Sequence, residues 1–314
     1  MRGAKSKLVA ETNRPNCSRA CGVLAPRRMR LPINRSALGA LLCAWSALAP
    51  SQLVAQASTA LAPGVPLFTW RDAVLAGGFV VGTLALRPVD ESYAERLQVK
   101  SAQSNRFLQD VSTVVRTIAE PGAMIIGGTL YAAGRISKQH DMADLGLHGT
   151  EAVAVGAAFA DVLKLSFGRA RPFVHPPTDS TGYNANDWQL GRGLKGGDRY
   201  RSFPSGHTVA AFAAAAAVAN ETARWWPNLT WVIGPVMYGG AGMVGLSRMY
   251  NNRHWATDVM MGAAIGTFAG NKIVRYHHKT HPGNKFDKWL LGGSVRAASG
   301  GGYSFSWSIL PAPR

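Results

Sequence analysis

Cysteine and acidic residues are scarce in this chain, and each shortage narrows the kinds of site it can hold. The three cysteines, Cys17, Cys21 and Cys43, all lie within the first 57 of the 314 residues. If that segment is removed, the mature protein has no disulfide and no metal site built on cysteine. Charged residues make up only 16% of the chain, and 34 Lys and Arg outnumber 17 Asp and Glu.

The resulting net charge of +17 does not indicate a nucleic-acid partner. Residues 1–57 carry much of the excess, with nine basic residues against one acid, Glu11. Elsewhere several basic residues gather in short motifs. No basic stripe with interleaved aromatic residues, of the kind that marks nucleic-acid binding, is present in the sequence. We therefore expect no nucleic acid as a partner.

The first 57 residues resemble an export leader. An apolar stretch at 37–49 is followed by Ala55-Gln56-Ala57, which fits a small-residue cleavage site. Met29 is a candidate start that gives a leader of ordinary length. The positive region before the apolar stretch holds Arg27, Arg28, Arg30 and Arg35. An uncleaved membrane anchor is the alternative, and both interpretations place the protein in the periplasm or on the outer face of a membrane.

Strand signatures are few in the rest of the chain, and helical patterns dominate. Six Ala-, Gly- and Val-rich segments predict helices at 69–87, 121–136, 144–165, 205–221, 229–247 and 255–276. A further amphipathic helix is predicted at 101–119. We expect an all-α protein, a bundle of about six core helices with the active site at one end.

The predicted organisation has four parts. Residues 1–57 form the leader, 58–100 a linker and the first helix, 101–276 the helical catalytic domain, and 277–314 a C-terminal tail. Weak alternation of apolar residues in 289–314 predicts an irregular or β-like tail with one short strand or hairpin.

The lengths of these segments do not decide whether the helices are embedded in a membrane. Only 225–247 is uninterrupted by charge or histidine over the roughly 18 residues that a spanning helix needs. The shorter runs are typical of buried core helices, although charges at helix ends can reach the interface. If an exported N-terminus were followed by six spans, the helix at 144–165 would end on the cytoplasmic side. Either the first segment does not span, or the bundle lies outside the membrane.

Three clusters contain residues suited to phosphate chemistry. Lys164 and Arg171-Pro172 stand where the helix at 144–165 ends and its loop begins. A lysine and an arginine there can converge on one anion, although cations at a helix C-terminus also simply suit the helix dipole.

The second cluster is Arg201-Ser202-Phe203-Pro204-Ser205-Gly206-His207-Thr208, a turn followed directly by a helix. The free N–H groups of a helix start favour an anion, and His207 lies beside them. An N-cap serine and a structural histidine are the plainer interpretation.

The third cluster is Ser247-Arg248, followed by His254 and, four residues later, Asp258. Residues four apart on a helix share a face, so Asp258 can accept a proton from one nitrogen of His254 and leave the other free as a nucleophile. Because the helices alternate in direction, two helix C-termini and two N-termini meet at one end of the bundle. All three clusters are therefore expected there.

Together these clusters resemble the three-part signature of the type 2 phosphatidic acid phosphatase and vanadium haloperoxidase superfamily, over about residues 144–276. The matching stretches are Lys164-x6-Arg171-Pro172, Pro204-Ser205-Gly206-His207 and Ser247-Arg248-x5-His254-x3-Asp258. Three ordered motifs with fixed spacing are far more specific than any one of them.

The resemblance implies a role for each matching residue. His254 would attack phosphorus and form a phosphohistidine, Asp258 would orient it, and His207 would protonate the leaving group and then activate water. The phosphate oxygens would be held by Lys164, Arg171, Ser205, Gly206 and Arg248. No metal is implied, and we expect no cofactor and no histidine or carboxylate cluster outside the site.

The expected function is an extracytoplasmic, metal-independent phosphatase acting on lipid phosphates or on soluble monoesters or diphosphates. A haloperoxidase with vanadate as cofactor is the first alternative, although the mature chain is short for one; otherwise vanadate is an expected inhibitor. A non-catalytic surface or membrane protein with a vestigial phosphate site is the second. Trp188 and Tyr183, in the polar loop at 174–203, would either shape a lipid groove or cover the site. The sequence does not indicate an oligomeric state.

Overall fold

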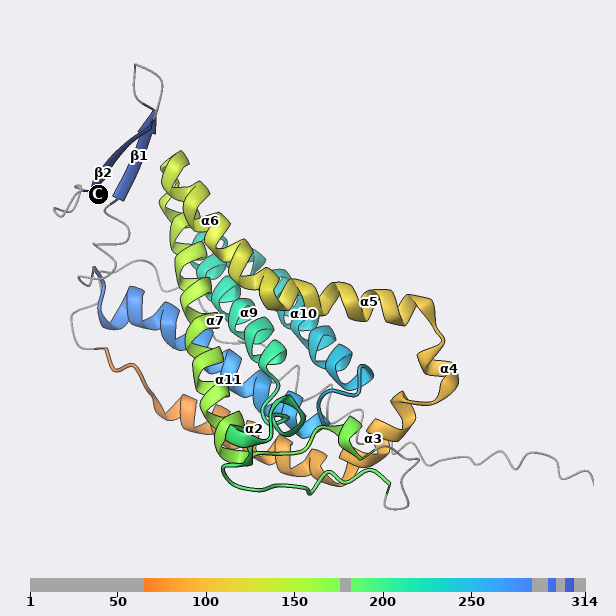
Figure 1. Ribbon diagram of the computed structural model, residues 1–314. Coiled ribbons are helices and arrows are strands. Elements are labelled where there is room, and N and C mark those ends of the chain that lie inside the picture. Colours follow the sequence, from red (N-terminus) through yellow and green to blue (C-terminus); the bar gives the residue numbers. More distant parts are fainter. Residues whose placement is uncertain (1–64, 176–181, 284–292, 298–302, 308–314) are drawn as a thin grey trace, which may run out of the picture. The chain divides into compact units, whose positions relative to one another are not determined.

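The computed structural model describes residues 65–175, 182–283, 293–297 and 303–307, and within them the chain is almost entirely helical (Figure 1). The α-helices are α2 (Trp70–Leu86), α3 (Asp90–Leu97), α4 (Lys100–Gln103), α5 (Arg106–Thr117), α6 (Ala123–Ser137), α7 (His140–Phe167), α8 (Arg192–Lys195), α9 (Gly206–Trp225), α10 (Thr230–Tyr250) and α11 (Ala256–Arg275). Short 3-10 turns are η1 (Arg87–Val89), η3 (Pro172–Val174), η4 (Asp198–Tyr200) and η5 (Pro227–Leu229), and π turns are η2 (Ile118–Gly122) and η6 (Tyr276–Thr280). The predicted all-α fold is confirmed.

The six core segments predicted from composition correspond to α2, α6, α7, α9, α10 and α11. The helix predicted at 101–119 is instead divided into α4 and α5. Asn105 explains the break, because its side chain accepts a hydrogen bond from the backbone N–H of Leu108 at 3.3 Å and so caps α5. Helix α3 was not predicted, and it holds a residue of the site.

The centre of the bundle is built from small residues. Helix α9 packs against α7, α10 and α11, and its buried face is mostly alanine. Helix α11 approaches α9 through glycines: a Cβ on Gly266 would lie 2.4 Å from the carbonyl oxygen of Val209, and one on Gly270 would lie 2.5 Å from that of Ala213. Larger side chains would force the two helices apart, so their close packing requires these glycines.

Large apolar side chains lie on the outside of the bundle instead. Trp231 at the start of α10 is 77% exposed. Other exposed apolar residues are Trp70, Val81 and Leu84 of α2, Phe107 and Val114 of α5, Ile125 and Ile136 of α6, Phe159 and Val162 of α7, and Val236 and Leu246 of α10. Small residues inside and large apolar residues outside are the distribution expected of helices that face lipid.

Two stretches are long and apolar enough to cross a membrane, Trp70–Leu97 and Pro227–Tyr250. The second contains the run at 225–247 singled out in the sequence. The first was not, because Asp72 and Arg87 bound its uninterrupted apolar run. In the structure the helical path continues past Arg87 through η1 into α3, which gives the longer stretch.

The C-terminal tail contains the predicted β-like element. Strands β1 (Gly293–Ala297) and β2 (Tyr303–Trp307) pair antiparallel, with Gly293 opposite Trp307.

Candidate active site

His254 lies in the loop between α10 and α11 and is only 4% exposed. Its Nδ1 is 2.7 Å from the carbonyl oxygen of Ser202. A carbonyl oxygen can only accept, so Nδ1 carries the proton and donates it. The other nitrogen, Nε2, therefore holds a lone pair, and it lies 3.3 Å from Nη1 of Arg171. The imidazole is fixed in the tautomer that a nucleophile needs.

The electrostatic surroundings keep His254 neutral. Burial lowers the pKa of its imidazole from 6.5 to about 4, the nearby Asp258 opposes that change, and Arg171 adds to it. A neutral imidazole with a free Nε2 is present over the whole neutral and mildly acidic range.

Asp258, fully buried in the first turn of α11, does not contact His254 in the way predicted. Its Oδ2 is 3.7 Å from Nδ1 of His254, too far for a hydrogen bond. The same oxygen accepts from the Ser202 hydroxyl at 2.5 Å and from the backbone N–H of Trp255 at 2.9 Å. The predicted direct acceptor is thus replaced by the Ser202 carbonyl. Asp258 positions that serine, and Ser202 was not assigned a role from the sequence.

Arg169 is the main residue that the motifs did not reveal. Its guanidinium is buried and donates to Asp258, to Asp90 of α3 at 2.7 Å and to the hydroxyl of Thr257 at 2.6 Å. Asp90 in turn accepts from the backbone N–H of Thr257 at 2.9 Å. Arg169 therefore joins the loop after α7 to α3 and to the start of α11, and its donors are consumed in holding them.

Arg171 is buried beside His254 and fixed by main-chain and side-chain oxygens. Its Nε donates to the carbonyl of Asp198 at 2.7 Å, and its Nη2 to the Asp198 carboxylate at 2.6 Å. Nη1 also donates to the carbonyl of Arg253 at 3.2 Å. Burial lowers the pKa of this guanidinium, and Asp198 opposes the effect.

Arg248, at the end of α10, differs from the other two arginines. It is 7% exposed, and its Nε is buried with no hydrogen-bond partner among the described residues. Its charge acts on both Arg171 and His207, which places it within the same cluster. A buried guanidinium with an unsatisfied donor is costly unless an anion completes it.

The start of α9 brings Lys164 to Gly206. A Cβ on Gly206 would lie 2.7 Å from Nζ of Lys164, so glycine is the residue that allows the ammonium to approach the helix N-terminus. Nζ also donates to Asp161 at 2.8 Å. The first N–H groups of α9 have no intrahelical acceptor, so they add partial positive charge at this point.

Ser205 precedes Gly206 and is completely buried, but it makes no side-chain cap. Its hydroxyl oxygen accepts from Thr208 at 2.8 Å, and its backbone N–H donates to the Asp258 carbonyl at 3.1 Å. The predicted capping hydrogen bond is therefore wrong: Ser205 joins the start of α9 to that of α11.

His207 lies on the first turn of α9, and its Nδ1 is 3.0 Å from the carboxylate of Glu120 in η2. The contact leaves Nε2 as the nitrogen available to a substrate. Glu120 was not identified from the sequence, because it lies outside the three motifs.

Part of the chain is similar to a known protein family. Residues 147–282 match the family model of the PAP2 superfamily, and this segment includes every site residue predicted from the sequence.

The proteins to which this chain is similar include a lipid phosphatase. A segment of 87 residues is 42% identical to the lipid A 1-phosphatase of Porphyromonas gingivalis. The match covers 28% of this chain and 19% of that relative, so it spans about a fifth of the relative's length. The fold is also similar to the crystal structure of a transmembrane PAP2 type phosphatidylglycerolphosphate phosphatase from Bacillus subtilis. That likeness has a TM-score of 0.50 at 19% identity, and covers 69% of this chain and all of the other.

The loop after α7 supports the site from outside. Trp188 lies over the guanidinium of Arg169, 4.5 Å from ring centroid to Cζ, and packs edge-on against Phe203. Tyr183 is buried and packs edge-on against Trp255. These contacts attach the loop to Arg169, Phe203 and Trp255, which surround His254 and Asp258.

At the other end of the helices the fold forms a cluster that the sequence did not suggest. The sequence suggested no histidine or carboxylate cluster outside the motifs, yet His148, Glu221 and His278 are brought together within 4.8 Å. The three residues are distant in sequence, so no spacing signalled them.

Proposed function

We propose that this protein is a membrane-embedded phosphatase that removes phosphate from lipid phosphates through a phosphohistidine on His254. The main observation that supports the proposal is the position of the Nε2 atom of His254. Its Nε2 lone pair, fixed by the Ser202 carbonyl, faces Arg171 in a buried cluster with the unsatisfied Arg248. A nucleophile beside an incomplete anion site is what transfer of a phosphoryl group requires.

In the first step, the lone pair on Nε2 of His254 attacks phosphorus and an N–P bond forms. The bond from phosphorus to the ester oxygen breaks, and that oxygen receives a proton from His207. Burial and the positive charges of Arg248 and Lys164 lower the pKa of His207 to about 3. The negative charge of the substrate phosphate and Glu120, 3.0 Å from Nδ1 of His207, oppose this effect and favour the protonated imidazole that must donate the proton. The dephosphorylated alcohol then leaves.

In the second step, a water molecule attacks the phosphohistidine while His207 takes one of its protons. The N–P bond breaks, its electron pair returns to Nε2 of His254, and inorganic phosphate leaves. His207 ends the cycle protonated, as it began, and the Ser202 carbonyl holds the same tautomer of His254 throughout.

The charge on the transferring group would be balanced by side chains. Arg171 and Arg248 are buried next to His254, and Lys164 and the N–H of Gly206 approach from the start of α9. Ser205, already bonded to Thr208, would support the turn. Four positive or partially positive groups supply the stabilisation that metal ions supply in other phosphoryl-transfer enzymes, so we expect catalysis without a divalent metal.

A lipid substrate is supported by the apolar surface and by the activity of one similar protein. The outer faces of α2, α6, α7 and α10 are rich in large apolar side chains, two stretches have the length of membrane spans, and the relative matched over 87 residues is a lipid A 1-phosphatase. The leader predicted at 1–57 favours a site on the extracytoplasmic face. Inserted helices would place the site where a phosphorylated headgroup lies.

The decisive experiment compares two substrates with the same phosphate. Purified protein in detergent is given phosphatidic acid in mixed micelles or free glycerol 3-phosphate, and phosphate release is measured with and without EDTA. We expect much higher kcat/KM for the lipid and no loss with EDTA.

Equal rates on the two substrates would overturn the lipid preference, and a requirement for a divalent metal would overturn the mechanism. Vanadate should inhibit competitively. Bromide oxidation by peroxide after vanadate loading, without phosphate release, would favour the haloperoxidase alternative.

A further inference from the structure

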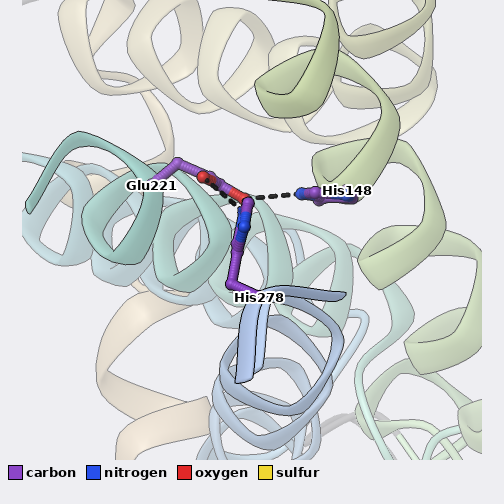
Figure 2. A group of neighbouring side chains, drawn as sticks. All are labelled: His148, Glu221 and His278. Carbon is purple, nitrogen blue, oxygen red and sulfur yellow. Dashed lines mark hydrogen bonds and ion pairs between the residues drawn. The ribbon is translucent and has the colours of Figure 1, made fainter. Parts of the chain in front are cut away.

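A second group of ionisable side chains lies at the end of the core helices remote from His254. His148 is in the first third of α7, Glu221 is near the C-terminus of α9, and His278 is in η6 just after α11 (Figure 2). Because an α-helix rises 1.5 Å per residue, Glu221 is roughly 20 Å along α9 from His207. The group is therefore separate from the candidate active site.

We propose that His148, Glu221 and His278 bind a divalent metal ion of the zinc class, which ties α7, α9 and the end of α11 together. Two imidazole nitrogens and a carboxylate oxygen are a donor set that zinc uses in proteins. The three donor atoms lie within 4.8 Å of one another. Donor atoms of a tetrahedral zinc ion lie about 3.4 Å from one another, so side-chain rotations that bring the farthest pair closer and separate the closest pair complete the site.

The position of one nitrogen is the strongest argument for a cation. Nε2 of His278 is 2.8 Å from Oε1 of Glu221 and 2.7 Å from Nη1 of Arg224. The carboxylate can only accept and the guanidinium can only donate, so neither protonation state of this nitrogen satisfies both neighbours. If the lone pair binds a metal ion that also binds Glu221, the conflict disappears.

The burial of Glu221 and His148 also favours a bound cation. Glu221 is 0% exposed, and Nδ1 of His148 is 2.5 Å from its Oε1. A buried carboxylate needs positive charge close to it. Here that charge comes from Arg224, whose side chain is 43% exposed and whose Nη1 is 2.9 Å from Oε2. Arg224 is therefore free to turn towards solvent when an ion takes its place.

Neighbouring groups complete the surroundings of the ion. Asp144 stands one turn before His148 on α7, on the same helix face, and acts electrostatically on His148, His278 and Glu221. It is the nearest candidate for a fourth ligand. His277, next to His278, stacks on the ring of His148 at 4.2 Å between centroids and contacts Glu151 at 2.7 Å. These contacts hold η6 against α7 before any ion binds.

Metal titration of the full chain in detergent, after removal of bound metal with a chelator, tests the proposal. Cobalt(II) should bind one equivalent and give the visible absorption of a tetrahedral site, and zinc should displace it. At zinc concentrations 100-fold above Kd, the Tm should rise by about 5–10 °C.

Variants of the proposed ligands, compared with a control variant, test where the metal ion binds. His278→Ala and the isosteric Glu221→Gln should weaken zinc binding at least ~10-fold, whereas His281→Ala, an exposed histidine three residues further on, should not. Arg224→Gln should bind zinc as tightly as the wild type or more tightly. Gel filtration shows that each variant is folded.

Three results would overturn the proposal: no stoichiometric binding, wild-type affinity in His278→Ala, or loss of binding in His254→Ala, which would place the ion in the active site. None of the readouts depends on turnover, so the phosphatase proposal stands or falls separately.

Discussion

The two ends of the core helices carry buried charges of opposite sign. At one end, Arg248 is buried near Arg171 and His254, and its Nε has no hydrogen-bond partner among the described residues. At the other end, a buried carboxylate, Glu221, is surrounded by imidazoles. Helices α7 and α9 contribute to both clusters. The two proposals assign an anion to the first end and a cation to the second, because the buried charge at the two ends differs in sign.

Two arginines at the same end show why pairing decides the role of a charged residue. Arg169 and Arg248 are both buried, but Arg169 donates to Asp90, Asp258 and Thr257. Arg169, which is fully paired, holds the surrounding helices together. Arg248, which is incompletely paired, can bind a ligand. Substitutions that remove each group in turn separate these roles.

The largest expected effect is the loss of the nucleophile. His254→Ala should lower kcat/KM on phosphatidic acid by at least ~10³-fold, because it removes the Nε2 that attacks phosphorus. His281→Ala is the matched control, since it removes an exposed histidine.

The covalent intermediate provides a direct readout of this prediction. Labelled substrate quenched in alkali, in which a phosphohistidine survives, should leave label on the wild type and none on His254→Ala. A labelled His254→Ala protein would contradict the assignment. In His207→Ala, an ester with a good leaving group should still label the protein, but the label should turn over slowly.

Substituting the incompletely paired arginine should affect activity much more than stability. Arg248→Ala should lower kcat about 10²- to 10³-fold, as expected when one donor to the transition state is lost. The Tm should hold or rise, because a buried charge without a full set of partners is removed. Vanadate inhibition measured in parallel should weaken. Normal turnover in this variant would remove Arg248 from the anion site.

Substituting Arg169, the fully paired arginine, should affect stability much more than activity. Arg169→Met leaves Asp90 and Asp258 buried without their cation, which costs about 3–5 kcal/mol, or a fall in Tm of roughly 10 °C. Asp90→Asn keeps the shape of the side chain and should cause a smaller loss of Tm. An Arg169→Met protein as stable as the wild type would show that the network is not structural.

The sequence predicted the helices and the catalytic motifs because both are local patterns. Ala, Gly and Val periodicity locates α9 and α11, and fixed spacings locate His254 and Arg248. The supporting contacts are not local: Asp90 is separated from Arg169 and Thr257 by 79 and 167 positions. Glu221 and His278 are likewise 57 positions apart. Only the packing of α3, α9 and η6 brings such pairs together, so no motif could signal them.

The hydrogen-bond partner of His254 is another contact that the sequence motifs could not predict. The four-residue spacing predicted Asp258 as the acceptor, and the two residues do share a helix face. The structure inserts a carbonyl from the loop before α9, that of Ser202, at 2.7 Å from Nδ1. Spacing along one helix gives proximity, but the intervening loop decides which oxygen receives the proton.

The smallest expected effect concerns the acid limb of the pH profile. Burial first, and then Arg171, lower the pKa of His254 to about 4 against the opposing effect of Asp258. Protonation below that pH removes the Nε2 lone pair, so the contribution of His254 to kcat/KM should be sustained down to about pH 5 and fall as pH drops through about 4. Phosphate monoesters take up their second proton near pH 6, so the substrate adds a separate break above the one assigned to His254.

The Asp258→Asn variant provides a further test of the acid limb of the pH profile. The variant removes a negative charge that raises the pKa of His254, so the acid limb should move to lower pH, whatever happens to the maximal rate. Rates of protein labelling with a p-nitrophenyl ester report the first step alone and avoid a contribution from His207 in the second. An acid limb near pH 6.5, the ordinary value for histidine, would mean that water reaches His254 and that the site is more open than its burial indicates.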